Sequence, residues 1–224
     1  MRRTRDPVFD RERAYADCHR IALALASGVL PGRALDLGAG QGAVSQALKD
    51  LGFEVTAADA NTAQFRAAGV TCMDLDLNKP APFPDGTFDL VMAIEIMEHL
   101  EAPRAFLREI FRLLKPGGLA VLTTPNISSV PSRLFFLATG YFDLFVPTER
   151  RLKDPLSSAG DGHISPLPGW LVRYFAKDVG FAIERTDYTM AYIPGVPRGV
   201  LRFVRGRLFG RLGLYAIRKP LGRH

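Results

Sequence analysis

Three glycines at alternate positions follow a short apolar run that contains one carboxylate. The run is Ala34–Leu37, the acid is Asp36, and the glycines are Gly38, Gly40 and Gly42. A brief apolar run, then glycines, then a helical pattern is typical of the turn from a buried strand into a helix. Glycine is needed there because a Cβ would keep a ligand away from the backbone, and the helix N-terminus beyond offers N–H groups to that ligand. This junction therefore predicts an α/β fold with a binding site where its first strand ends.

The rest of the chain alternates short apolar runs with helical stretches. This alternation indicates a mostly parallel sheet with helices packed against it. We expect one domain over residues 1–224, with a leading helix within residues 1–30, an insertion over residues 125–165 and a basic helical segment over residues 196–212. Strands are predicted over residues 34–37, 53–58, 70–73, 88–94, 119–123, 181–185 and 213–218.

The net charge of +6 comes from one part of the chain. From Tyr188 onward there are 8 basic residues and no acid, which leaves 21 Lys and Arg against 23 Asp and Glu elsewhere. In a helix Arg198, Arg202 and Arg205 share one face, but this phase is lost after Gly206. The segment therefore allows a peripheral membrane contact through these three arginines, or simply a helix docked on the sheet with solvated arginines. A nucleic-acid partner is not favoured, because the rest of the chain is nearly neutral.

Other features exclude further classes. Cys18 and Cys72 alone make neither a disulfide framework nor a zinc site. No apolar run is long enough for a membrane-spanning helix. Acidic residues between Asp6 and Asp17 interrupt the basic start that would otherwise resemble a signal peptide. We therefore expect a cytoplasmic protein, and its oligomeric state stays open.

Two more acids stand at predicted strand ends. Asp59 follows the second strand, 19 residues after Gly40, where a carboxylate can accept hydrogen bonds from both ribose hydroxyls. Asp74 follows the third strand and could accept from an adenine amino group. A dinucleotide fingerprint would place its third glycine one position after Gly42 and an apolar residue where Asp36 stands. A dinucleotide-dependent oxidoreductase is therefore the alternative rather than the main prediction.

Together these segments resemble the class I S-adenosylmethionine-dependent methyltransferases. Leu35–Gly42 is similar to that family's first motif, Phe88–Leu100 to its fourth-strand motif, and Leu113–Gly118 to the turn into its fifth strand. Order and spacing agree over residues 30–124. The resemblance implies a Rossmann-like, seven-stranded, mostly parallel sheet with helices on both faces and a lid insertion that builds the acceptor pocket.

The resemblance also implies S-adenosylmethionine as the cofactor and a set of residues that bind it. Asp36 and the glycines are expected at the methionine end, together with residues that follow the fourth strand. The second and third strands are expected to supply the groups for ribose and adenine. The implied cofactor-binding residues are Asp36, Gly38, Ala39, Gly40, Gly42, Asp59, Ala60, Asp74, Leu75, Ile94 and Glu95.

Two histidines are candidate catalytic bases, because methyl transfer to a hydroxyl benefits from a proton acceptor in a dry pocket. His163 lies at the end of the insertion, and His99 lies in the sequence Glu95-x-x-Glu98-His99. A structural role is the competing interpretation for each of them. The metalloprotease pattern needs histidine at both ends of such a motif, so we expect no bound metal.

The acceptor class is narrowed by what the sequence lacks. Residues 94–97 carry neither the Asn/Asp-Pro-Pro-aromatic nor the Pro-Cys sequence of nucleic-acid methyltransferases of this fold. Thr139–Phe142 with Gly162–Ile164 resembles bacterial methyltransferases of small molecules and cell-surface glycans. We therefore predict methyl transfer to a hydroxyl of a small molecule or glycan. The alternative of a non-catalytic cofactor-binding domain with a basic membrane or nucleic-acid contact remains. An RNA methyltransferase is supported only by the net charge.

Overall fold

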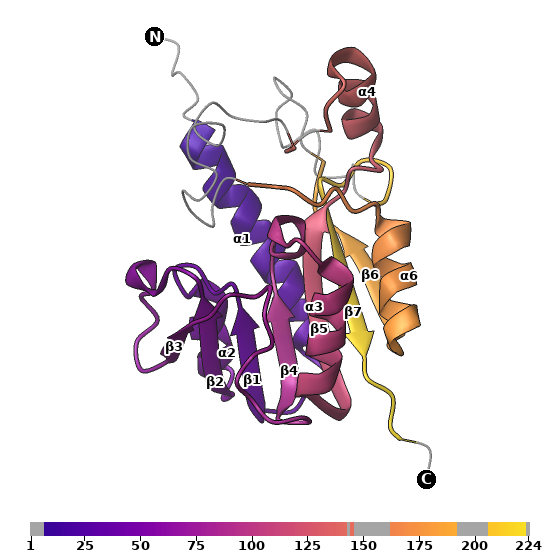
Figure 1. Cartoon of the computed structure of the whole chain (residues 1–224). Coiled ribbons are helices and arrows are strands. Elements are labelled where there is room, and N and C mark those ends of the chain that lie inside the picture. The colour runs from indigo at the N-terminus through magenta and orange to yellow at the C-terminus, as the bar shows by residue number, and fades with distance from the viewer. Residues whose placement is uncertain (1–6, 143, 146–161, 192–205, 223–224) are drawn as a thin grey trace.

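The computed structural model describes residues 7–142, 144–145, 162–191 and 206–222 of the chain. In this part of the chain seven strands form one sheet in the order β3-β2-β1-β4-β5-β7-β6 (Figure 1). The strands β1 to β5 pair in parallel, while β7 runs antiparallel to both of its neighbours. The strands are β1 (Arg33–Leu37), β2 (Glu54–Asp59), β3 (Thr71–Asp74), β4 (Phe88–Ala93), β5 (Leu114–Pro125), β6 (Ala182–Tyr188) and β7 (Leu212–Arg218).

Helices pack on both faces of this sheet, as predicted. Helices α1 (Pro7–Ala26) and α2 (Ala43–Asp50) cover one face, and α3 (Pro103–Leu113) and α6 (Gly169–Val179) cover the other. Helix α4 (Val130–Thr139) stands above the sheet at the end where β5 finishes (Figure 1). The short 3-10 helices are η1 (Thr62–Gln64) and η2 (Met97–His99).

The central strands β1, β4, β5 and β7 are mostly buried because both of their faces are covered. On β4, Val91 and Ala93 belong to the core beneath α3 and α6. Leu90 and Met92 point the other way, into the core beneath α1 and α2. This alternation follows from the two-residue period of a strand, and it makes β4 a rigid support for the residues that follow it.

The register of the parallel strands brings their carboxyl ends to one edge of the sheet. Leu37, the last residue of β1, pairs with Ala58 on one side and Ala93 on the other. Asp59 pairs with Asp74 at the ends of β2 and β3. Strand order reverses direction at β1, and ligands of open α/β sheets bind in the crevice at such a point.

The insertion contains a helix that the sequence prediction did not include. The Ser129 side chain accepts a hydrogen bond from the Ser132 N–H (3.3 Å) at the start of α4, and Gly140 ends the helix with φ 78°. Only residues 125–142, 144–145 and 162–165 of the predicted insertion are described. Its role as a lid stays a prediction.

The described part of the predicted basic segment, residues 206–212, is not helical. Residues 206–209 form a turn, closed by the Gly210 N–H donating to the Gly206 carbonyl (2.7 Å), and Leu212 already belongs to β7. Arg198, Arg202 and Arg205 lie outside the described residues, so the membrane contact stays a prediction. Among the helices of the described part, none is both long and apolar enough to cross a bilayer.

Candidate functional site

The three loop glycines serve two different purposes. All three have positive φ, at 72°, 54° and 88° for Gly38, Gly40 and Gly42. A Cβ on Gly38 would lie 1.9 Å from Ile96 Cδ1, and one on Gly42 would lie 2.7 Å from the Phe65 ring, so these two glycines are required by packing. A Cβ on Gly40 would meet nothing within 4 Å. The space beside Gly40 is therefore open for a ligand to approach the backbone.

Asp59 fixes this loop in place. Its Oδ2 accepts a hydrogen bond from the Gly40 N–H (2.7 Å), and its Oδ1 accepts one from the Asn61 N–H (2.8 Å). The Gly38 and Ala39 N–H groups donate to the Ala58 carbonyl (2.8 and 3.1 Å). Each carboxylate oxygen has a further lone pair, so Asp59 can still accept from a ligand hydroxyl.

Asp36 lies in β1 beside the loop, and its expected place at the methionine end of the cofactor stays a prediction. Its Oδ2 accepts a hydrogen bond from the Ser45 hydroxyl (2.5 Å) in the first turn of α2. Burial raises the pKa of Asp36 to about 6, and the hydrogen bonds from Ser45 limit that rise. Asp36 thus joins β1 to α2, while Asp59 holds the loop.

The other residues predicted on the nucleoside side follow β2 and β3. Asp74 is exposed and stands beside Asp59 through the pairing of the two strand ends. The Leu75 N–H donates to the Asp59 carbonyl (3.2 Å), and Ala60 is exposed next to Asp59. The edge therefore offers acceptors for hydroxyl and amino groups beside the open space at Gly40. These groups fit an S-adenosyl nucleoside.

Glu95 follows Ile94 directly after β4 and is held in a strained conformation. Its φ is 57°, and Leu144 is the other non-glycine residue with positive φ among those described. Such strain costs roughly 1–3 kcal/mol and is typical of functional sites. Thr123 of β5 holds it there, accepting from the Glu95 N–H (2.8 Å) and donating to Glu95 Oε1 (2.7 Å). Burial raises the pKa of Glu95 to about 7, against the Thr123 hydrogen bond and the charge of Arg211.

The structure brings His99 and His163 together. The Glu98 carbonyl accepts from the N–H groups of Ile164 (2.8 Å) and Ser165 (3.0 Å), which holds residues 162–165 against η2. His99 Nδ1 lies 3.2 Å from the Gly162 carbonyl. The two imidazole rings meet edge to face with their centroids 4.7 Å apart. Both candidate bases therefore belong to one site, next to the end of β4.

Glu98 completes this group, although it was not among the site residues expected from the sequence. Its side chain is fully buried, and neither carboxylate oxygen has a hydrogen-bond partner among the described residues. Burial, followed by the neighbouring Glu95 carboxylate, raises its pKa well above the usual value. A signal was present, since Glu98 stands three positions after Glu95 in an apolar stretch where a carboxylate needs a purpose.

The same group has donor atoms suited to a divalent cation. One ligand atom each from Glu98, His99 and His163 lie within 4.8 Å of one another. The expectation of no metal rested on the missing first histidine of a contiguous motif, whereas this second histidine comes from the far end of the insertion. Imidazole and carboxylate are common zinc and manganese ligands. The absence of a metal stays a prediction that chelation can test.

The fold and this edge of the sheet define a class of protein. A seven-stranded sheet whose β7 runs antiparallel between β5 and β6, with a glycine turn after β1 and an acid after β2, is the architecture of the class I S-adenosylmethionine-dependent methyltransferases. A family model described as a methyltransferase domain matches residues 9–185. The chain belongs to this family, whose cofactor is S-adenosylmethionine.

Sequence relatives cover part of the chain. It is 34% identical over 124 residues to a protein named ubiquinone biosynthesis O-methyltransferase from Caulobacter sp. (strain K31), covering 51% of this chain and 49% of the relative. A protein of the same name from Xanthomonas campestris is 31% identical over 138 residues, covering 57% of this chain and 58% of the relative. The chain thus spans about half the length of the relatives it matches.

Solved structures agree on the fold. A SAM-dependent methyltransferase from Archaeoglobus fulgidus superposes with a TM-score of 0.64 at 19% identity, covering 96% of this chain and all of that one. A Burkholderia thailandensis 1,6-didemethyltoxoflavin-N1-methyltransferase, solved with S-adenosylhomocysteine, has a TM-score of 0.59 at 15% identity, covering 96% of this chain and 81% of that one. At such identities the likeness concerns the fold alone.

Proposed function

We propose that this protein transfers a methyl group from S-adenosylmethionine to a hydroxyl oxygen of a small-molecule or glycan acceptor. The observation that carries the proposal is the group formed by Glu98, His99 and His163 beside the end of β4, since the cofactor residues surround the neighbouring strand ends. The O-methyltransferase names of the sequence relatives support oxygen as the methylated atom.

The cofactor would lie across the carboxyl ends of β1, β2 and β4. Asp59 would accept from the ribose hydroxyls, Asp74 and Leu75 would flank the adenine, and the open side of Gly40 would admit the ligand to the backbone. When bound, S-adenosylmethionine supplies a methyl group on a positively charged sulfur. Ile94 and the strained Glu95 would face this end of the cofactor from the segment directly after β4.

His163 is suited to accept the proton of the acceptor hydroxyl. The Gly162 carbonyl can only accept a hydrogen bond, so His99 Nδ1 donates to it. His99 thereby holds the backbone beside His163, whose ring packs between His99 and Phe145 (centroid distances 4.7 and 5.1 Å).

The test combines labelled S-adenosylmethionine with a panel of phenols, catechols and sugars. We expect label on oxygen, and we expect His163→Ala to lower kcat by about 10²- to 10⁴-fold, the usual worth of a positioned base. The Kd for S-adenosylmethionine should stay within about twofold, since His163 lies outside the cofactor residues. Ile164→Ala is the matched control, because that half-exposed side chain belongs to the same segment and only its backbone holds the site.

Four outcomes would contradict the proposal. Loss of cofactor affinity in His163→Ala would place this residue in cofactor binding, and unchanged turnover would remove it from catalysis. Cofactor binding without a labelled product from any acceptor class would favour a non-catalytic domain. A thermal shift with NAD but not with S-adenosylmethionine would favour the oxidoreductase alternative.

A further inference from the structure

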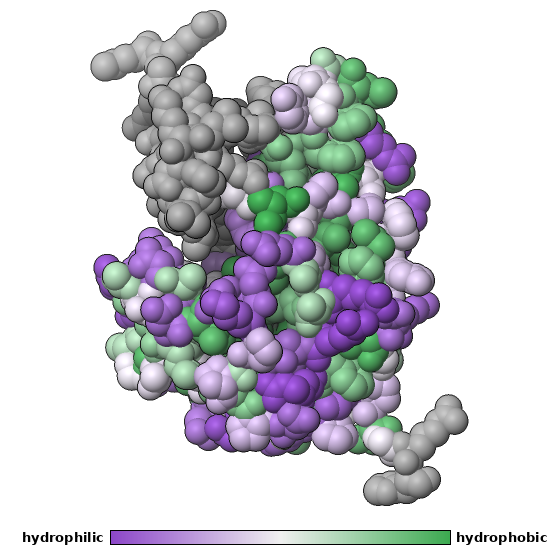
Figure 2. Space-filling view, viewed as in Figure 1, coloured by the Kyte–Doolittle hydropathy of each residue, from purple (hydrophilic) through white to green (hydrophobic). Residues whose placement is uncertain are grey.

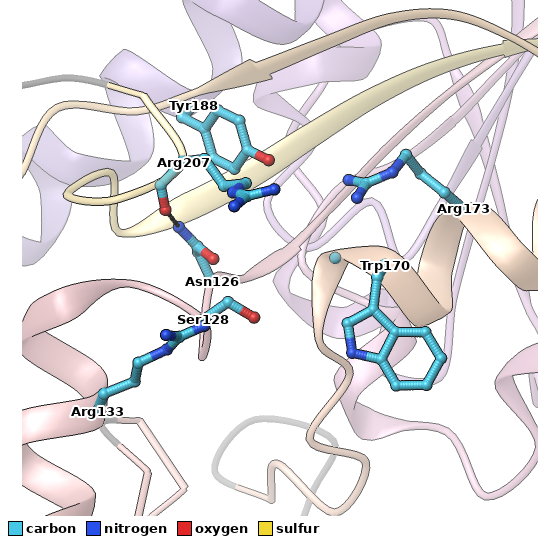
Figure 3. Close-up of a pocket in the computed structure, with 8 residues that line it drawn as sticks. Asn126, Ser128, Arg133, Trp170, Arg173, Tyr188 and Arg207 are labelled. Carbon is cyan, nitrogen blue, oxygen red and sulfur yellow. Dashed lines mark hydrogen bonds between the residues drawn. The ribbon is translucent and has the colours of Figure 1, made fainter.

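A second concave site lies outside the residues discussed so far. It is a pocket of about 140 Å³ at the amino-terminal ends of α4 and α6, beside the last residues of β5 and β6 (Figure 3). Whole drug-sized ligands fill roughly 300–1,000 Å³, so this pocket has the size for one functional group. It is lined by Asn126, Ser128, Arg133, Gly169, Trp170, Arg173, Tyr188 and Arg207.

Three guanidinium groups reach this pocket from separate elements. Arg133 belongs to α4, Arg173 to α6, and Arg207 to the turn before β7. Figure 3 shows Arg173 and Arg207 directed toward the same space, below the Tyr188 ring. No Asp or Glu lines the pocket, and none of the three arginines forms an ion pair among the described residues.

Several arginines elsewhere in the described part have acidic partners. Arg104 pairs with Asp178 and Arg218 with Glu184, so the fold neutralises these cations itself. Three guanidinium groups gathered with no counter-ion among the described residues repel one another. A cluster of this kind is stabilised when an anion binds, because guanidinium groups form short, charge-assisted hydrogen bonds with oxyanions.

The pocket also has a fixed frame of neutral groups. Asn126 is buried, and its amide nitrogen donates to the carbonyls of Arg207 (2.9 Å) and Gly210 (2.8 Å), which ties the turn that carries Arg207 to the end of β5. No side chain caps the amino terminus of α6, and the positive end of the helix dipole lies at Gly169. The Ser128 hydroxyl faces the same space (Figure 3).

We propose that this pocket binds a phosphate group, as a monoester or diphosphate, carried by the methyl acceptor. A phosphate monoester has a charge of about −1.5 to −2 at pH 7, so it matches three guanidinium groups better than one carboxylate does. The indole of Trp170 is 61% exposed at the rim and offers a flat face to a sugar or aromatic ring attached to that phosphate.

The position of the pocket on β5 links it to the methyl-transfer site. Asn126 stands three residues after Thr123, which holds Glu95, and three strand residues span roughly 10 Å. One acceptor could therefore place its phosphate among the arginines and its hydroxyl near His163. This step rests on the proposed methyltransferase activity, whereas phosphate binding by itself does not.

The binding test is calorimetric titration of inorganic phosphate and pyrophosphate into the full chain saturated with S-adenosylhomocysteine. We expect pyrophosphate to bind, and we expect the double variant Arg173→Gln/Arg207→Gln to weaken it at least tenfold, as loss of charge-assisted hydrogen bonds does. Arg108→Gln is the control, because this exposed α3 arginine is remote from the pocket and carries the same charge. No pyrophosphate binding, or equal binding by the double variant, would overturn the proposal.

The acceptor test uses a cell extract, labelled S-adenosylmethionine and a phosphatase. If the phosphate belongs to the acceptor, treating the extract with phosphatase before the reaction should abolish most of the methyl labelling. Pyrophosphate should also compete with the acceptor. Two results together would overturn the acceptor assignment: phosphatase treatment leaves the label unchanged, and added acceptor does not relieve inhibition by pyrophosphate. They would show that the pocket binds a separate phosphate ligand. If neither the treated nor the untreated extract is labelled while pyrophosphate still binds, the result would instead contradict the proposed methyltransferase function.

Discussion

Replacing Gly40 with alanine separates the backbone strain of the loop from the space that the loop leaves open. Gly40 has φ 54°, and an added Cβ would meet nothing within 4 Å. The left-handed conformation costs a residue with a Cβ roughly 1–2 kcal/mol. In a chain of this size each kcal/mol lowers Tm by roughly 2–4 °C, so Gly40→Ala should lower Tm by roughly 2–8 °C without cofactor.

Gly86→Ala supplies the matched control at the opposite end of the parallel strands. Gly86 has φ 61°, and its added Cβ would lie 4.0 Å from Lys115 Cα, an ordinary contact. Its loss of Tm should therefore resemble that of Gly40→Ala, as measured by differential scanning fluorimetry. Only the methyl group at Gly40 would enter the space of the cofactor.

The affinity for S-adenosylhomocysteine distinguishes the two variants. Overpacking a fitted site costs roughly 1–3 kcal/mol, which raises Kd by about 5- to 150-fold for Gly40→Ala. Calorimetry should show no such change for Gly86→Ala. Equal affinities in the two variants would refute the placement of the cofactor beside Gly40.

Two further predictions concern buried and clustered carboxylates. Burial raises the pKa of Asp36 to about 6, so the folded state holds the carboxyl proton more tightly than the unfolded chain does. The contribution of Asp36 to the free energy of unfolding therefore falls by about 3 kcal/mol as the pH rises from 4 to 6. Asp36→Asn should therefore raise Tm at pH 7.5 with a gain that shrinks toward pH 4; a gain independent of pH would contradict this. EDTA should leave methyl transfer unchanged if Glu98, His99 and His163 act without metal, and activity lost to EDTA and restored by Mn²⁺ or Zn²⁺ would show that they hold an ion.

The central strands could be predicted because they are buried on both faces, unlike the edge strands β3 and β6. Continuous apolar runs such as Phe88–Ala93 identify central strands, and the glycines between runs mark the turns. Helix α4 was missed for the opposite reason. Its apolar residues, 134–137, are consecutive and exposed, as the apolar colouring at the top of Figure 2 shows, so they have no helical periodicity to detect.

The meeting of Asp59 and Asp74 was predictable from the sequence, whereas the meeting of the two histidines was not. Asp59 and Asp74 are carried to one edge by chain order alone, since each ends a parallel strand. The meeting of His99 and His163 depends on backbone hydrogen bonds between η2 and a segment about 63 positions later, which no local pattern specifies. The arginine pocket likewise combines residues from separate elements whose spacing in sequence is irregular.

The hydrogen-bond partners of Asp36 and Asp59 could not be predicted from the sequence motif. Asp36 and Asp59 both stand at the carboxyl ends of strands beside the loop, yet only Asp59 accepts from a loop N–H. Asp36 is instead satisfied by Ser45, nine positions later on α2. Side-chain direction follows from the strand's two-residue period, but the available donor follows from how the next helix is placed.

A crystal structure of the full chain with S-adenosylhomocysteine tests the central claim most directly. The ribose hydroxyls should lie within about 2.6–3.2 Å of the Asp59 carboxylate, a normal hydrogen-bond distance. The adenine should lie beside Asp74 and Leu75, and the sulfur should face Glu95 and the His99–His163 pair. A nucleoside bound away from Asp59, or a sulfur directed away from the two histidines, would contradict the account.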